Sequence, residues 1–147
     1  HALLPIASGA TEEEIAASRI DPVRAHLPTE YIPEAKLRID YYRQLAMADT
    51  LEAVKETQAA LKDRFGKIPA SAERLLAITR IRIRAEMAGM RVVETEGNRL
   101  KCQFAKSGPR EFYKLSGRFP RLTGKTADLR LRDIEQILAR LCHNPTL

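Results

Sequence analysis

The chain has 147 residues, 44% of them apolar and 30% charged, which is enough for one hydrophobic core but not for two. No run approaches the roughly 20 apolar residues that a membrane-spanning helix needs, and nothing at the start is typical of a signal peptide. The two cysteines lack CxxC spacing, which favours free thiols in a reducing compartment. We therefore expect a cytoplasmic protein that has no membrane contact.

The net charge of +6 is concentrated in the last third of the chain. From Arg99 onward there are 11 Lys and Arg against 4 Asp and Glu, a balance of +7, whereas residues 1–98 carry 14 against 15, a balance of −1. This asymmetry makes a polyanionic partner such as nucleic acid worth weighing.

The beginning of the chain predicts little regular structure. Residues 1–18 are rich in Gly, Ser and Ala and are predicted to be a linker, so that residues 19–147 form a single domain. Residues 19–27 alternate partly and contain Pro22, which predicts an edge strand. After Pro33 the apolar residues follow a helical spacing, which predicts a first helix with one buried face: Leu37, Tyr41, Leu45 and Ala48.

The stretch 49–89 organises the chain as two helices with a stop between them. Asp49 and Glu52 have the spacing of a capping box, and Gly66 supplies a residue that can end the helix before Pro69 opens the next. The second helix has two apolar arcs separated by arginines, so we expect it to be packed on two sides at the centre of the domain and to end at Gly89. The arcs are Leu75, Leu76, Ile83 and Met87, and Ile78, Ile81, Ala85 and Ala88.

The remaining chain predicts a mixture of strands and helices. Residues 91–104 read as a hairpin with its turn at 96–98, and residues 111–115 as a short helical turn. Residues 127–132 alternate like an exposed strand, after which Asp133 caps a last helix with a stripe of Ile134, Ile137, Leu138 and Leu141. The predicted class is α+β: an edge strand, three helices with a central Arg-rich helix, a hairpin, a further strand and a C-terminal helix.

The motifs associated with catalysis are incomplete. Gly124-Lys125-Thr126 ends like a phosphate-binding loop, but the glycine needed five residues earlier is Phe119, and the motif precedes a predicted strand. The histidines and cysteines lack metal-ligand spacing. No nucleophile motif is present, so we expect no catalysis by this chain alone, no metal and no cofactor.

A basic stretch in the last third is interleaved with aromatic residues. Its cations are Arg110, Lys114, Arg118, Arg121 and Lys125, and its rings are Phe112, Tyr113 and Phe119. Such a mixture can contact phosphates and stack on bases. It can equally place the rings in the core while the cations are solvated, and the small number of aromatic residues favours this second interpretation. A basic accessory domain that touches DNA through residues 99–140 is the alternative function.

The polar face of the helix after Asp49 also has two interpretations. Glu52, Lys55, Glu56, Lys62 and Asp63 can form an electrostatic docking surface for another protein module. A charged helix face is more often simply solvated.

Three groups of residues together resemble a known family. They are Tyr31-Ile32-Pro33 with Leu37-Arg38-Ile39 and Tyr41-Tyr42-Arg43, the run Leu61-Lys62-Asp63-Arg64-Phe65-Gly66-Lys67-Ile68-Pro69, and an Arg-rich helix that ends at Ala88-Gly89. In order and spacing, residues 19–89 resemble the C-terminal domain of bacterial transcription-repair coupling factor (Mfd). The hairpin and the terminal helix are compatible with that domain but fit it more loosely.

The resemblance implies a regulatory module without catalysis of its own. In that family the parent protein is an ATP-driven DNA translocase that removes stalled RNA polymerase and recruits the excision-repair protein UvrA. The C-terminal domain packs on the N-terminal UvrA-binding module and masks it. The resemblance places the contact at Asp63 and Arg64, with Glu56 and Lys62 beside them. Relatives often carry a glutamate where this chain has Ala60.

Overall fold

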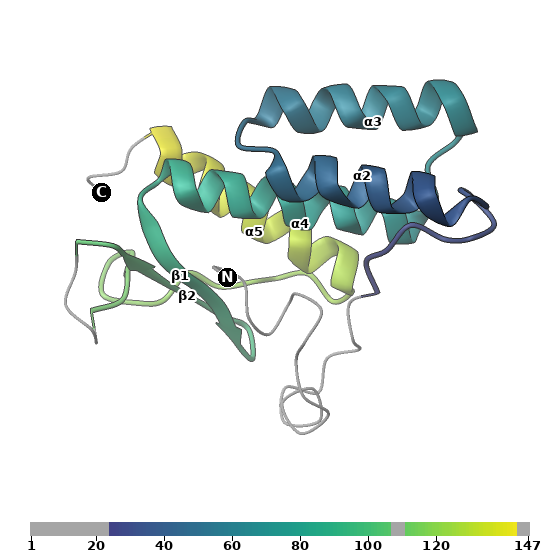
Figure 1. Cartoon of the computed structure of the whole chain (residues 1–147). Helices are drawn as coiled ribbons and strands as arrows, with labels where there is room; N and C mark the ends of the chain where they lie inside the picture. The colour runs from purple at the N-terminus through teal and green to yellow at the C-terminus, as the bar shows by residue number, and fades with distance from the viewer. Residues whose placement is uncertain (1–23, 107–110, 144–147) are drawn as a thin grey trace.

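The computed structural model describes residues 24–106 and 111–143, and within them the chain is an α+β domain, as predicted (Figure 1). The predicted linker 1–18 and residues 19–23 of the predicted edge strand lie outside the described residues. The described elements are, in chain order, the helices α2 (Ala35–Met47), α3 (Leu51–Phe65) and α4 (Ala70–Met87), the strands β1 (Met90–Glu96) and β2 (Arg99–Phe104), and the helix α5 (Ala127–His143).

Helix α4 lies at the centre of the domain, as its two apolar arcs predict. On one side Ala72, Leu76 and Ile83 join a core cluster with α2, α3 and the segment before α2. On the other side, residues including Ile81 and Ala85 join a second cluster with the hairpin and α5. The arcs are those predicted except at the end of the helix, where Met87 is 59% exposed. The helix therefore separates two cores and connects α3 to the hairpin (Figure 1).

Helix α3 ends at Gly66 as predicted, but its N-terminal capping residue is not the predicted one. The helix is capped by Thr50, whose hydroxyl accepts a hydrogen bond from the Ala53 N–H at 3.1 Å, and not by Asp49. A threonine directly before the first helical turn competes with the aspartate one residue further out, and the nearer side chain makes the bond. At the other end Gly66 has φ 86° and ψ −159°, a conformation that is essentially restricted to glycine.

The prediction of an edge strand is wrong for its described part, residues 24–27. The His26 N–H donates to the carbonyl of Ser71 at 3.1 Å, and the Leu27 N–H donates to the hydroxyl of Tyr42 at 2.8 Å. These two N–H groups thus donate to a helix terminus and to a side chain instead of to a neighbouring strand. The segment lies against the helices and is not part of a sheet.

The predicted hairpin is confirmed, with β1 and β2 antiparallel and Glu96 opposite Arg99 beside the turn. The predicted helical turn at 111–115 is wrong, because this segment runs beside β2, where the Tyr113 N–H donates to the Cys102 carbonyl at 2.7 Å. A tight turn at Ser116 and Gly117, both with positive φ, then brings the chain back along β2.

The predicted strand 127–132 is also wrong, because these residues begin α5. Thr126 accepts a hydrogen bond from the Leu129 N–H at 3.2 Å and takes the capping role predicted for Asp133. The apparent alternation of leucines belongs to a helical stripe that includes Leu131, which is 2% exposed, and leaves out Leu129, which is 42% exposed. The stripe continues through the predicted Ile134, Leu138 and Leu141, which are buried. No helix in the described ranges is both long and apolar enough to cross a membrane.

Candidate partner-binding face and basic face

Helix α3 buries one face and exposes the other. Val54 and Leu61 are fully buried against α2 and α4, whereas Glu52, Glu56 and Asp63 are exposed. These three carboxylates follow one another at i, i+4 and i+11, so they lie along one line of the helix. Figure 1 shows α3 at the edge of the molecule, with α2 and α4 beneath it. The outer surface of α3 is therefore an acidic line open to solvent.

The four predicted partner-binding residues all lie on the exposed part of α3. Lys62 and Arg64 flank the acidic line on either side of Asp63. The guanidinium of Arg64 lies 5.4 Å from the centre of the Phe65 ring, while Glu56, Lys62 and Asp63 form no ion pair within residues 24–106 and 111–143. Glu52, which belongs to the predicted polar face of this helix but not to the contact implied by the family resemblance, lies on the same line.

The C-terminal end of α3 is fixed by an aromatic cluster. The Tyr31 hydroxyl lies 3.0 Å from the Leu61 carbonyl and 2.8 Å from the Gly66 carbonyl, and can donate to either. The Phe65 ring packs at 5.6 Å from that of Tyr31 and at 6.0 Å from that of Tyr41. Burial, with smaller effects of Glu73 and Tyr41, raises the pKa of Tyr31, so the hydroxyl keeps its proton and remains a donor. Asp63 and Arg64 are thus held on a rigid helix end.

The arginines that divide the two arcs of α4 join helices to one another. Arg74 pairs with Asp128 of α5 at 2.7 Å, and Arg80 pairs with Glu135 of α5 at 2.6 Å. Arg82 donates to two carbonyls at the end of α2, at 3.0 and 2.7 Å. A cation at a helix C-terminus satisfies carbonyl groups that have no partner within the helix. These three cations therefore serve the fold of the domain.

Arg130 joins α5 to the hairpin, a role that the sequence pattern did not predict. Its guanidinium donates to the side chain of Asn98 at 2.9 Å and to the carbonyl of Gly97, so α5 holds the turn of the hairpin. Burial lowers the pKa of Arg130, an effect opposed by the nearby carboxylate of Asp133. The residue is 8% exposed, although the alternating pattern predicted an exposed position.

The predicted basic residues are brought together only in part. Arg118 and Arg121 line a pocket of about 290 Å³ together with Arg99, Gly117 and Phe119. Lys114 lies beside it, with its ammonium 5.2 Å from the centre of the Phe119 ring. Arg110 lies outside the described residues, and Lys125 is exposed in the turn before α5, away from the pocket lining. Arg99 was missed as a member, although its position after a two-residue hairpin turn places it on the outer face of β2.

Some aromatic rings in this region lie at the core and others at the surface, so each of the two interpretations of the sequence holds for part of them. Tyr113 packs against the second core cluster and meets Phe104 at 6.1 Å. Phe112 and Phe119 meet each other at 6.2 Å, and Lys101 lies 4.6 Å from the centre of the Phe112 ring. The Tyr113 ring therefore faces the core, whereas the Phe112 and Phe119 rings contact lysine ammonium groups.

The motif Gly124-Lys125-Thr126 precedes a helix, which corrects the prediction that it precedes a strand. The N–H groups of Thr123 and Gly124 donate to the carboxylate of Asp133, at 2.9 and 2.7 Å. A Cβ atom on Gly124 would come within 2.6 Å of the Leu129 Cβ, so the glycine permits close packing. In a phosphate-binding loop such N–H groups would donate to the ligand, but here they already donate to the Asp133 carboxylate.

The two cysteines are reduced thiols in the structure. Burial raises the pKa of Cys102 to about 12, and burial also raises the pKa of Cys142, whose thiol donates to the Arg84 carbonyl at 3.2 Å. Such thiols are poor nucleophiles and poor metal ligands. Across the described ranges no group of three His, Cys, Asp or Glu residues is arranged to hold a metal ion.

Comparison with known proteins identifies the family. The sequence model of the TRCF domain matches residues 22–115. The transcription-repair-coupling factor of Mycobacterium tuberculosis is 42% identical over 81 residues, which cover 54% of this chain and 7% of that protein. The Escherichia coli factor is 38% identical over 68 residues, 46% of this chain and 6% of that protein.

A solved structure supports the same assignment at the level of the fold. The crystal structure of a C-terminal domain of transcription-repair coupling factor matches with a TM-score of 0.62 and 23% identity, over 84% of this chain and 92% of that chain. The family match covers more than half of the sequence and includes α2, α3, α4 and the hairpin. The chain belongs to the TRCF domain family.

Proposed function

We propose that this chain is a regulatory C-terminal domain of a transcription-repair coupling factor, which inhibits its parent by packing on the parent's N-terminal UvrA-binding module. The observation that carries the proposal is the outer face of α3. It presents Lys62, Asp63 and Arg64 at a rigid helix end and Glu56 further up the same helix, and none of these four forms an ion pair within the described part of the chain.

A polar contact of this kind suits a mask that must be released. Holding 99 of 100 molecules closed needs only about 2.7 kcal/mol between the closed and open forms. A few charge pairs that become desolvated when the two surfaces meet supply energies of this order. When they separate, the exposed face of α3 returns to water without uncovering its apolar residues, because Val54 and Leu61 stay buried in the domain's own core.

The proposal assigns the chemistry of the parent to other parts of the protein. The match covers 7% of the length of the M. tuberculosis factor. In the proposal this part supplies a contact surface, and the motor belongs to other parts of the parent. In the proposed mechanism the parent is an ATP-dependent DNA translocase that displaces stalled RNA polymerase. UvrA and RNA polymerase then depend on this domain only indirectly, through the state of the mask.

The test is a titration of this chain with the N-terminal module of its parent at two salt concentrations. Asp63→Ala and Arg64→Ala are each expected to weaken binding roughly tenfold at low salt, which corresponds to about 1.4 kcal/mol. Asp40→Ala and Arg43→Ala, which change the same residue types on the exposed face of α2, are the matched controls and are expected to leave binding unchanged. Absence of binding by the wild type at low salt would refute the proposal.

A further inference from the structure

We propose that this chain has a second surface, on the hairpin side, that binds the phosphodiester backbone of nucleic acid. This basic face consists of Arg99, Lys101, Lys114, Arg118 and Arg121. It lies on the opposite side of the molecule from α3 (Figure 1). Arg118 and Arg121 follow the last residue matched by the family model, so the inference does not depend on the family assignment.

The backbone places two of the arginines directly opposite each other. Arg99 and Arg121 form an antiparallel bridge, which is closed by the Leu100 N–H bonded to the Pro120 carbonyl and the Leu122 N–H bonded to the Asn98 carbonyl. In this register the paired residues do not bond to each other, and their side chains approach more closely than in the bonded register. Like charges directly opposite each other destabilise a strand pair. An anion bound between the two guanidinium groups relieves that repulsion.

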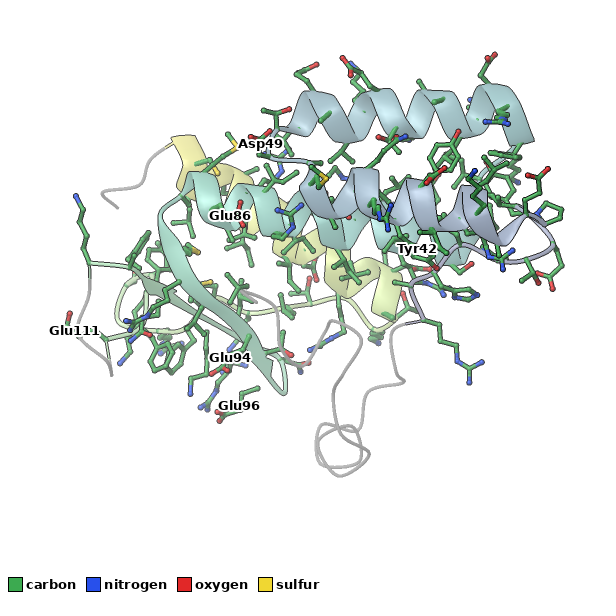
Figure 2. All side chains as sticks on the ribbon, viewed as in Figure 1. Tyr42, Asp49, Glu86, Glu94, Glu96 and Glu111 are labelled. Atoms are coloured by element: carbon green, nitrogen blue, oxygen red, sulfur yellow. The ribbon has the colours of Figure 1, made fainter. Side chains whose placement is uncertain are left out.

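Within residues 24–106 and 111–143, no ion pair joins a carboxylate to an arginine of the pocket. The carboxylate of Glu96, which lies opposite Arg99 in the hairpin, pairs with Lys101 at 3.2 Å. Glu94 lies opposite Lys101, one step further from the pocket, and Figure 2 shows both glutamates along the hairpin. The pocket lining holds three arginines and no carboxylate. Its charge is therefore available to a ligand.

The ligand is a phosphate-bearing polymer because of the type and arrangement of the donors. Guanidinium groups bind phosphate oxygens through two parallel hydrogen bonds, and three arginines line a pocket of about 290 Å³. Lys101 is paired with Glu96, whereas Lys114 forms no ion pair within the described residues and extends the positive surface beyond the pocket, where successive phosphates of a backbone would lie. A single small anion would use the pocket alone and leave the charge of Lys114 uncompensated.

The aromatic rings support this backbone contact and do not act as stacking platforms. Lys101 lies 4.6 Å from the centre of the Phe112 ring and 5.7 Å from that of Phe119, and Lys114 lies 5.2 Å from that of Phe119. The lysines thus occupy positions over the rings that stacked bases would need. Binding is therefore expected to depend strongly on salt and weakly on base sequence.

The experiment measures fluorescence anisotropy of labelled DNA with the complete 147-residue chain. The probes are a single strand of about 20 nucleotides and a duplex of about 20 base pairs, each titrated between about 50 and about 200 mM salt. The site variant is Arg118→Gln with Arg121→Gln, both exposed in the structure. The matched control, Lys36→Gln with Arg43→Gln, removes the same charge from the exposed face of α2.

Loss of two phosphate contacts is expected to lower the slope of log K against log salt by about 1.8 for the duplex and about 1.4 for the single strand. At about 0.1 M salt the first value corresponds to roughly 60-fold weaker duplex binding, with the control variant close to the wild type. Tighter binding to one probe at the same salt concentration identifies which form of the backbone fits the face.

Three outcomes would overturn the proposal. They are no binding to either probe at about 50 mM salt, equal losses in the site and control variants, and competition by polyglutamate as effective as that by unlabelled DNA of equal charge. The last would assign the face to acidic polypeptides. Circular dichroism of both variants verifies that they fold. Failure here would leave the proposal for α3 untouched, since the two faces share no residue.

Discussion

Replacing Arg130 by methionine tests how the hairpin is attached to the helical part of the domain. The side chain reaches from α5 to the turn of the hairpin, where it donates to Asn98 and Gly97. Methionine keeps most of the apolar stem and removes all of the donors. The substitution therefore isolates the polar part of the contact from its packing.

The expected cost follows from the bonds that are lost. A hydrogen bond from a charged donor contributes about 1.5–3 kcal/mol, and two are removed. Part of this is offset because the mutant no longer buries a charge, and that burial is the reason the pKa of Arg130 is lowered. We expect a net loss of about 2–3 kcal/mol in the free energy of unfolding, or about 10 °C in the melting temperature.

Urea unfolding followed by circular dichroism measures this loss, with Arg132→Met as the matched control. Arg132 is two residues away on the same helix, is exposed and forms no ion pair within the described ranges. Its replacement is expected to change stability by less than about 0.5 kcal/mol. The reasoning is refuted if the two variants unfold at the same urea concentration with the same m-value.

Three further changes test other parts of the account. Gly66→Ala is expected to cost about 1–3 kcal/mol in thermal unfolding, because φ 86° with ψ −159° strains any other residue even though a Cβ atom would meet nothing within 4 Å. Arg82→Met is expected to cost about 1–2 kcal/mol, because the carbonyls of Leu45 and Ala48 at the end of α2 lose the hydrogen bonds from the guanidinium, and Arg43→Met serves as its control. Stability is expected to fall by about 1.4 kcal/mol between pH 8 and pH 10 in the wild type relative to Cys102→Ala.

The sign of the last prediction follows from the thiol. The folded state holds the Cys102 proton up to a pKa of about 12, whereas the unfolded chain releases it near 9.0. Between these values the folded state binds more protons, so stability present below the lower value is lost as the pH rises. Identical pH dependence in Cys102→Ala and the wild type would contradict this prediction. A Gly66→Ala melting temperature at or above that of the wild type would contradict the backbone strain expected at position 66. An Arg82→Met loss no larger than that of Arg43→Met would contradict the capping role.

The helical half of the fold could be predicted because residues within each helix indicate where it ends and which face is buried. The stripe of α3 ends at Gly66, and α4 has two apolar arcs, so element type and central position both follow from spacing. The predictions failed where a short alternating run belongs to a longer helix. Leu129 and Leu131 alternate with arginines, but α5 buries only Leu131, together with Arg130. A buried arginine that reaches the hairpin turn is a tertiary contact, and no local pattern indicates it.

The candidate sites were predictable to different degrees. Asp63 and Arg64 lie on an exposed helix face, and helical spacing alone is enough to place them there. Arg99 is brought beside Arg121 by a bridge between β2 and a segment for which the sequence predicted no strand, so the pocket could not be assembled from the sequence. Long-range pairing of this kind depends on the register, which is set by the whole fold.

The most direct test of the proposed mask is to map its contact surface by nuclear magnetic resonance. Amide shifts of the labelled chain would be followed while the unlabelled N-terminal UvrA-binding module is added. The account predicts changes concentrated along the exposed face of α3, at Glu56, Asp63 and Arg64, that disappear at high salt. Changes confined to α2 or to the hairpin, or no changes at all, would contradict it.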